Sequence, residues 1–285
     1  MKCTPLLLVA LLCLGRASLA QAAPDTLARI AATQTINVGY SQDSPPFSFV
    51  GPDKKPAGFS IDLCAHVIAA ISRAVNQPKL KVNWVPGTVS ERLQMVKSGK
   101  LDLECANTTR TLSRMRDVDF SLLVFIETGG FLVRTDGSVT NFAGLNGKKI
   151  LVIKGTTTEQ RLLAQLKARL VNAEVIGVRD GNEGVARLEA AGADAFASDK
   201  IKLIGLASQS KTPERLALLQ EDLSFEPYAF ALPRGDASFR YEVDRALTQV
   251  YASPEIDTIF DRWLGKLGRP TGLLAAMFVL STIPE

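Results

Sequence analysis

Two threonine clusters follow short apolar runs at distant places in the sequence. Thr108 and Thr109 come shortly after "LDLEC", and the threonines at residues 156–158 come shortly after "KILVI". A strand that ends in threonines before a helix places hydroxyls and free backbone N–H groups at the positive end of that helix, where anions bind. An ordinary N-cap, with Glu159 completing the first turn, is the alternative that the second cluster leaves open.

An arginine follows the first cluster, because Arg114 lies a few residues beyond Thr109. Its guanidinium is a planar fork that matches a carboxylate in two simultaneous hydrogen bonds. Two threonine-rich strand ends and one guanidinium can close together on one carboxylate. These residues therefore predict a site for a small molecule that carries a carboxylate.

The elements that must position these residues alternate along the chain. Apolar runs typical of strands are separated by stretches that repeat apolar residues at helical spacing. Such alternation predicts parallel sheets with helices on both faces, in which ligands lie beyond the carboxyl ends of the strands. The expected strands are 36–40, 80–85, 101–105, 149–153, 173–178, 193–198 and 228–232, and the expected helices are 59–75, 89–99, 157–170, 182–192, 198–208, 237–251 and 254–267.

This alternation starts twice, which predicts two lobes. It begins at Ile36 and again near Lys149, and we interpret the Gly- and Asn-rich stretch 134–149 as a crossing between the lobes. The last two helical patterns are expected to return to the first lobe, so that two strands of chain cross. The predicted fold is α/β, each lobe a mainly parallel sheet flanked by helices, with lobe 1 formed by 23–131 and 234–285 and lobe 2 by 132–233.

Residues 1–22 have the pattern of a cleaved secretory signal peptide. Lys2 precedes a short apolar run, and the small residues Ser18 and Ala20 precede the expected cleavage site. The apolar run is shorter than the roughly 20 residues that span a bilayer. The apolar tail 271–280 is also too short for that, and we expect it to dock on the first lobe. The mature chain is therefore expected to be exported as a soluble protein.

The composition is that of a globular protein, with 46% hydrophobic and 22% charged residues. Removing Lys2 and Arg16 with the signal peptide leaves 33 − 2 = 31 basic and 29 acidic side chains. A mature net charge of 31 − 29, near +2, does not indicate nucleic-acid binding.

Two cysteines remain in the mature chain, Cys64 and Cys105. In an oxidising compartment they suggest one disulfide. Two buried free thiols remain an alternative, because the sequence does not show how far apart they lie. His66 lies within an apolar helical pattern, which favours a structural role. One histidine and two separated cysteines predict no metal site.

Three segments, "GFSIDLC", "LDLECANTTRTLSRMRDVDFS" and "GTTTEQRLL", resemble the periplasmic solute-binding proteins of amino-acid ABC importers (family 3, type II fold), and specifically their glutamate/aspartate-binding branch. The resemblance runs from about Ile36 to the final helices. It implies two α/β lobes joined by two crossing strands that close over one free amino acid. It also implies a monomer in the periplasm that delivers this ligand to a membrane permease, without a cofactor.

The resemblance assigns ligand-binding roles by position. The residues it places around the α-carboxylate of the ligand are Thr109, Arg114, Thr156 and Thr157.

Three further residues match positions that contact the rest of the ligand. Asp199 falls where the family places a carboxylate for the ammonium group, and the alternative is a helix N-cap. Asn107 is expected to offer a backbone carbonyl or amide. Arg92 matches a basic residue near the side-chain end of the ligand, and the alternative is a solvated helix face.

The sequence departs from the branch at the contacts to a side-chain carboxylate. Ser41, still a candidate ligand-binding residue, stands where the branch has an arginine, Val89 where it has a serine, and residues 181–182 where it has a histidine. A buried acidic side chain without these partners carries a large desolvation cost. The changes therefore predict a polar, uncharged ligand side chain, whereas Arg92 indicates an acidic one.

An enzyme on the same scaffold, similar to an exported cyclohexadienyl dehydratase, is the alternative function. It needs a proton donor that faces the ligand, and the candidates are Glu104, Glu159 and Lys154. We expect a binding protein and no catalytic residues.

Overall fold

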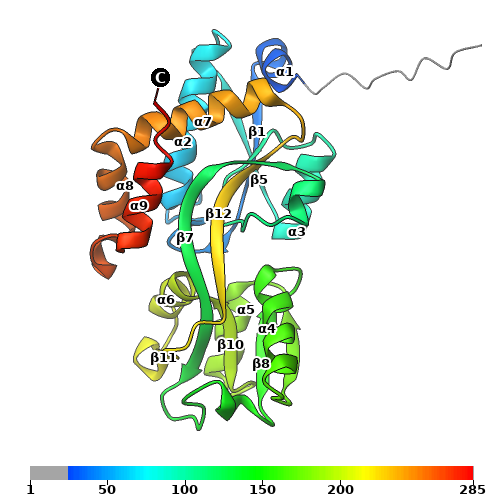
Figure 1. The fold of residues 1–285 in the computed structure, drawn as a ribbon, viewed down its shortest axis with the longest axis vertical. Helices are drawn as coiled ribbons and strands as arrows, with labels where there is room; N and C mark the ends of the chain where they lie inside the picture. Colours follow the sequence, from blue (N-terminus) through cyan, green and yellow to red (C-terminus); the bar gives the residue numbers. More distant parts are fainter. Residues whose placement is uncertain (1–24, 285) are drawn as a thin grey trace, which may run out of the picture.

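The computed structural model describes residues 25–284, so the predicted signal peptide lies outside the described residues. The chain forms two groups of helices and strands, which Figure 1 shows one above the other. We call them the upper group (α1–α3, β1–β6, α7–α9) and the lower group (α4–α6, β8–β11).

The upper group is built on a short parallel sheet. Its central strand β1 (Thr35–Tyr40) pairs in parallel with β5 (Lys81–Pro86) and with β6 (Leu103–Glu104). A separate three-stranded sheet contains β2 (Asp43–Ser44), β3 (Ser48–Val50) and β4 (Pro56–Ala57). The helices of this group are α1 (Thr26–Thr33), α2 (Phe59–Ala74), α3 (Val89–Lys97), α7 (Ala237–Tyr251), α8 (Glu255–Leu264) and α9 (Gly272–Leu280).

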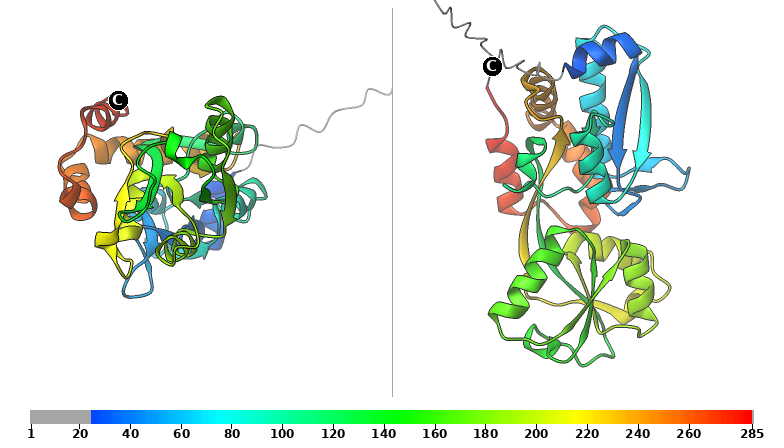
Figure 2. Two further views of the ribbon diagram at one scale, coloured as in Figure 1. Left: turned by 90° about the horizontal axis from the view of Figure 1, so that it is seen from below. Right: turned by 90° about the vertical axis from the view of Figure 1, so that its right-hand side faces the viewer.

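The lower group repeats this plan. Strand β8 (Lys149–Ile153) pairs in parallel with β9 (Glu174–Val178) and with β10 (Ala195–Asp199). The right view of Figure 2 shows its helices around the strands. These helices are α4 (Thr157–Ala168), α5 (Gly181–Glu189) and α6 (Lys200–Ser208), and the short strand β11 (Leu216–Leu218) lies beside them.

Two long strands join the groups. β7 (Asp119–Arg134) and β12 (Ser224–Leu232) pair antiparallel and run from the upper into the lower group (Figure 1). They make one nine-stranded sheet in the order β5-β1-β6-β12-β7-β10-β8-β9, with β11 beside β7. The sheet is therefore mixed. Its strands pair in parallel within β5-β1-β6 and within β10-β8-β9, and the pairs that involve β7 or β12 are antiparallel.

Each group buries its own apolar side chains. The core of the upper group contains an aromatic cluster in which Phe47 contacts Phe59, Phe125 and Tyr228 edge to face. The core residues of the lower group come from 131–223. Because α9 buries Leu274, Met277 and Phe278 in the upper core, the apolar tail docks as predicted.

The stretch 134–149 does not form the crossing that we expected. Val139, Phe142 and Leu145 are buried in the lower core, and the Arg134 guanidinium donates hydrogen bonds to carbonyls of the same group. The crossing is β7 itself. Glycine and asparagine mark irregular backbone, but they do not indicate which elements that backbone connects.

Cys64 of α2 and Cys105, just beyond β6, form a disulfide with a Cα–Cα distance of 6.0 Å. This confirms the predicted bridge over the alternative of two free thiols. In residues 25–284 we find no helix with both the length and the apolar character needed to cross a membrane.

Candidate ligand-binding site

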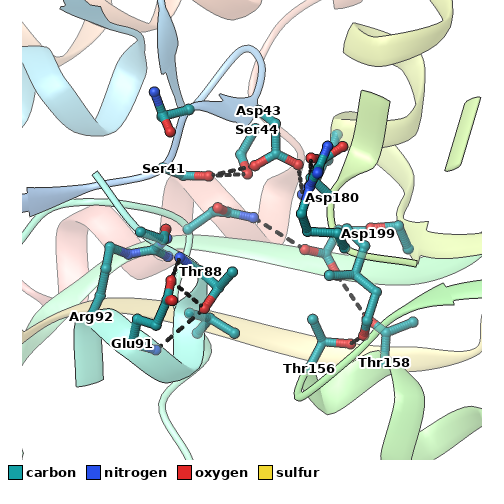
Figure 3. Close-up of a pocket in the computed structure, with 18 of the residues that line it drawn as sticks. Ser41, Asp43, Ser44, Thr88, Glu91, Arg92, Thr156, Thr158, Asp180 and Asp199 are labelled. Carbon is teal, nitrogen blue, oxygen red and sulfur yellow. Dashed lines mark hydrogen bonds and ion pairs between the residues drawn. The ribbon is translucent and has the colours of Figure 1, made fainter. Parts of the chain in front are cut away.

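A cavity of about 680 Å³ lies between the upper and lower groups (Figure 3). It is bounded by loops and helix starts that follow the carboxyl ends of β1, β6, β8 and β10, as expected for parallel strands. All the ligand-binding residues predicted from the sequence line it: Ser41, Arg92, Asn107, Thr109, Arg114, Thr156, Thr157 and Asp199.

Arg114 brings a cation without a carboxylate partner to this cavity. It begins a short 3-10 helix (Arg114–Arg116), and its guanidinium donates a hydrogen bond to the carbonyl of Thr109 at 2.7 Å. In the described part of the chain it forms no ion pair. Burial lowers the pKa of Arg114, while Glu104 and Glu226 act in the opposite direction. A largely buried guanidinium without an ion-pair partner favours an added anion, whereas its acidic neighbours oppose one.

Glu226 lies behind the cavity wall, holds two of the lining threonines, and was not predicted from the sequence. Its fully buried carboxylate on β12 accepts hydrogen bonds from Thr109 of the upper group at 2.6 Å and from Thr157 of the lower group at 2.7 Å. A hydroxyl has one proton to donate. In this arrangement both threonine hydroxyls give that proton to Glu226. The available signal was a single acidic residue inside the apolar run "FEPYAFAL".

The second threonine cluster combines both predicted roles. Thr156 is the N-cap of α4, since its hydroxyl accepts from the N–H of Glu159 at 3.1 Å and donates to the carbonyl of Ile153 at 2.8 Å. The next two backbone N–H groups, of Thr157 and Thr158, donate to no protein acceptor in the described chain. The helix start is therefore capped and still presents two donors to an anion.

Asp199 is buried at the end of β10 and forms no ion pair with any residue between 25 and 284. It stands at the N-cap position of α6, but its side chain makes no capping hydrogen bond, so the N-cap alternative does not describe its role. Instead it accepts from Tyr228 at 2.5 Å, from Asn107 at 3.3 Å and from Thr158 at 3.4 Å. Burial, with a contribution from the charge of Glu226, raises its pKa to about 6.

Asn107 reaches Asp199 through its side-chain amide. The expected contact between the backbone of Asn107 and the ligand stays a prediction.

Arg92 is buried and paired, so the alternative of a solvated helix face is wrong. Its side chain is 4% exposed, and its Nε donates to Glu104 at 2.7 Å. A second nitrogen donates to the carbonyl of Gly87. Helix α3 turns this residue toward β6, which a helical pattern with few apolar residues did not reveal.

Ser41 contacts a second ion pair, Asp43 with Lys202, which the sequence did not predict. Its hydroxyl donates to Asp43 at 3.0 Å, as Figure 3 shows. The carboxylate of Asp43 also accepts from the backbone N–H of Gly181 at 2.5 Å and lies 3.5 Å from the ammonium of Lys202. Burial alone would raise the pKa of Asp43, but Lys202 and the N–H of Gly181 lower it below its usual value. The signal for Lys202 was a second lysine among the apolar residues of the helix start "KIKLIGL".

The residues proposed for other chemistry do not line the cavity, although Glu104 pairs with the lining residue Arg92. Glu104, Glu159 and Lys154, the candidate proton donors, are not among the residues that line the cavity. His66 lies 3.5 Å from Glu255 between α2 and α8. Within residues 25–284, no group of three or more histidine, cysteine, aspartate or glutamate side chains is arranged to hold a metal ion.

The family model of bacterial extracellular solute-binding proteins, family 3, matches residues 36–266 of the chain. The chain belongs to this family. The family is extracytoplasmic by description, which agrees with the predicted export of this solute-binding protein.

Similar proteins cover most of this solute-binding protein. An L-glutamate/L-aspartate-binding protein of Pseudomonas aeruginosa is 34% identical over 249 residues, which is 87% of this chain and 82% of that protein. A glutamate/aspartate import solute-binding protein of Escherichia coli (strain K12) is 31% identical over 244 residues, which is 86% of this chain and 81% of that protein. Both relatives are binding proteins by name.

The fold is also that of solved amino-acid-binding proteins. The structure of an ancestral arginine-binding protein bound to glutamine is 26% identical, superposes with a TM-score of 0.73, and matches 81% of this chain and 98% of that chain. The mixed α/β fold of this solute-binding protein is thus shared with proteins that bind amino acids.

Proposed function

We propose that this solute-binding protein binds one polar or acidic L-amino acid in the cavity between its two groups and delivers it to the permease of an ABC importer. One observation carries the proposal. The same cavity is lined by a cation, Arg114, and by a buried carboxylate, Asp199, and neither forms an ion pair within the described residues. A zwitterion supplies both missing charges.

The α-carboxylate of the ligand pairs with the Arg114 guanidinium in two hydrogen bonds. The free N–H groups of Thr157 and Thr158 at the start of α4 add donors that attract the same anion. The ammonium group pairs with Asp199, which the hydrogen bonds of Tyr228 and Asn107 hold in place.

The upper and lower groups act as the two lobes of a type II binding protein, close to the expected lobe 1 (23–131 and 234–285) and lobe 2 (132–233). The return crossing lies earlier than expected, because Tyr228, Phe230 and Leu232 of β12 are buried in the upper core, and Phe131 belongs to the lower core. Three features support this division: separate cores, a cavity lined from both sides, and only β7 and β12 passing between the groups. The hydrogen-bond register of the two strands shifts between Tyr228 and Ala231, which makes this part of the sheet a suitable place for bending. A hinge here lets donors from both lobes meet on one ligand.

The names of the relatives support the transport role, since one of them is a glutamate/aspartate import protein. In this proposal the protein acts as a periplasmic monomer, and its physiological partner is the membrane permease.

Calorimetric titration of the mature protein with a panel of L-amino acids tests the proposal. Replacing Arg114 by alanine should weaken binding by about 2–5 kcal/mol, because a desolvated carboxylate loses its partner. Arg116→Ala, in the same 3-10 helix but exposed, is the matched control and should bind like the wild type. Absence of amino-acid binding in the wild type, or equal affinities of the wild type and the Arg114 variant, would contradict the proposal.

A further inference from the structure

Most of the cations that line the cavity are paired with carboxylates of the protein itself. The cationic side chains are Arg92, Arg114, Arg179 and Lys202. Arg92 pairs with Glu104, Arg179 with Asp180, and Lys202 with Asp43. In the described residues, Arg114 alone of the set has no carboxylate within ion-pair distance. One unpaired cation can pair with one carboxylate, and in a bound amino acid that carboxylate is the α-carboxylate.

The pair of Asp43 and Lys202 differs from the others in its place. Its side chains are 18% and 7% exposed, and both line the cavity, whereas Arg179 is 78% exposed. Asp43 comes from the upper group, and Lys202 and the N–H of Gly181 come from the lower group. An ammonium and a helix N-terminus together make an anion site. The carboxylate of Asp43 fills this anion site.

We propose that Asp43 determines the specificity of this protein: its carboxylate takes the cationic position formed by Lys202 and the start of α5, so the bound amino acid has an uncharged polar side chain, such as an amide, and not a carboxylate. This inference rests on the proposed function and narrows its ligand class.

The chemistry of Asp43 disfavours an acidic ligand and admits a neutral donor. A second ligand carboxylate would have to stay buried without a cation or displace Asp43 from Lys202, and either change leaves one carboxylate unpaired. A carboxylate has about four acceptor positions. Ser41, Gly181 and Lys202 contact Asp43, which leaves room for a donor such as an amide N–H of the ligand.

The serine at position 41 fits the same logic. An arginine at this position would add a cation beside Asp43. The hydroxyl of Ser41 instead donates to Asp43 without adding charge.

Titration of the wild type with glutamine and glutamate, and with asparagine and aspartate, tests the ligand class. We expect the better amide to bind at least tenfold more tightly than its acid. Asp43→Asn keeps the shape of the side chain and frees Lys202, so the preference for the amide over the acid should fall at least tenfold. Asp53→Asn makes the same charge change in an exposed loop of the upper group and should leave the preference unchanged.

A double variant, Asp43→Asn with Lys202→Met, removes the freed cation and should restore the preference for the amide. A restored preference would also show that the change in the single variant does not come from misfolding. Thermal melting of every variant is a second check of the fold. Three results would overturn this inference while leaving amino-acid binding intact. The wild type could bind glutamate or aspartate more tightly than the matching amide, or a basic amino acid more tightly than a neutral one. The preference for the amide could also be unchanged in Asp43→Asn. A wild type that binds no amino acid would overturn the proposed function as well.

Discussion

Two parts of the cavity wall differ in whether their charged side chains form ion pairs within the protein. In one part, Arg114 and Asp199 form no ion pair in the part of the chain that the structure describes. In the other, Arg92 and Lys202 are each matched by a carboxylate of the protein. We call these the unpaired and the paired part of the wall. The comparison shows that only the unpaired charges of a cavity indicate the charge of its ligand. Charges that the protein itself pairs do not.

The energetic reason is the cost of desolvation. A buried charge without a partner is unfavourable until an opposite charge arrives, so it favours binding. A buried pair is already satisfied, and opening it leaves an uncompensated charge. The unpaired part should therefore affect ligand binding first, and the paired part should affect stability first.

The largest effect should come from breaking a pair in the paired part. Arg92→Met leaves the fully buried Glu104 without its cation, and we expect a loss of about 3–5 kcal/mol in the free energy of unfolding. Denaturant titration measures it. Arg179→Met removes an exposed cavity cation that is also paired, and it should cause no measurable loss. Equal stabilities of the two variants would show that Arg92 is not held as described.

A smaller effect, on binding alone, should come from the unpaired part. Asp199→Asn removes the countercharge for the ligand ammonium, and we expect affinity to fall by about 2–4 kcal/mol with little loss of stability, since the carboxylate is buried beside Glu226. Asp222→Asn, at an exposed position of the same group, is the control. Calorimetry and melting curves on the same samples separate the two quantities. A variant that binds normally would remove Asp199 from the site.

The smallest effect should be a dependence of affinity on pH. Because the pKa of Asp199 is raised to about 6, its carboxylate is ionised above that pH and takes up a proton below it. The ligand ammonium must displace this proton, so affinity should be constant between pH 7 and 8 and fall below pH 6 by up to about tenfold, or 1.4 kcal/mol, per pH unit. Titrations across this range measure it, and affinity that rises toward acid would contradict the assignment.

Much of the fold could be predicted because its signals are local. The bounds of β8 and α7 match the expected strand 149–153 and helix 237–251, since apolar periodicity fixes such elements. β7 was harder to predict. Its apolar sequence contains Gly129 and Gly130 and continues through both groups, and no local pattern tells a strand within one group from a strand that joins two.

The candidate site divides in the same way. Residues at strand ends could be found, because parallel strands bring their carboxyl ends to one edge and thus gather Thr109, Thr156 and Asp199. The partners of these residues could not. Glu226 and Thr109 are 117 positions apart, and Asp43 and Lys202 are 159 apart, so which charge meets which depends on how the two groups come together.

The route of the chain through the two cores has a consequence for the order of folding. The lower core uses only residues 131–223, an uninterrupted stretch, whereas the upper core contains both Ile30 and Phe278. Closing contacts over such sequence separations is slow and has a high entropic cost. During synthesis from the N-terminus, the apolar face of α2 stays uncovered until α7 and α8 have been made and can pack against it. The group that begins the sequence should therefore be the last to become native.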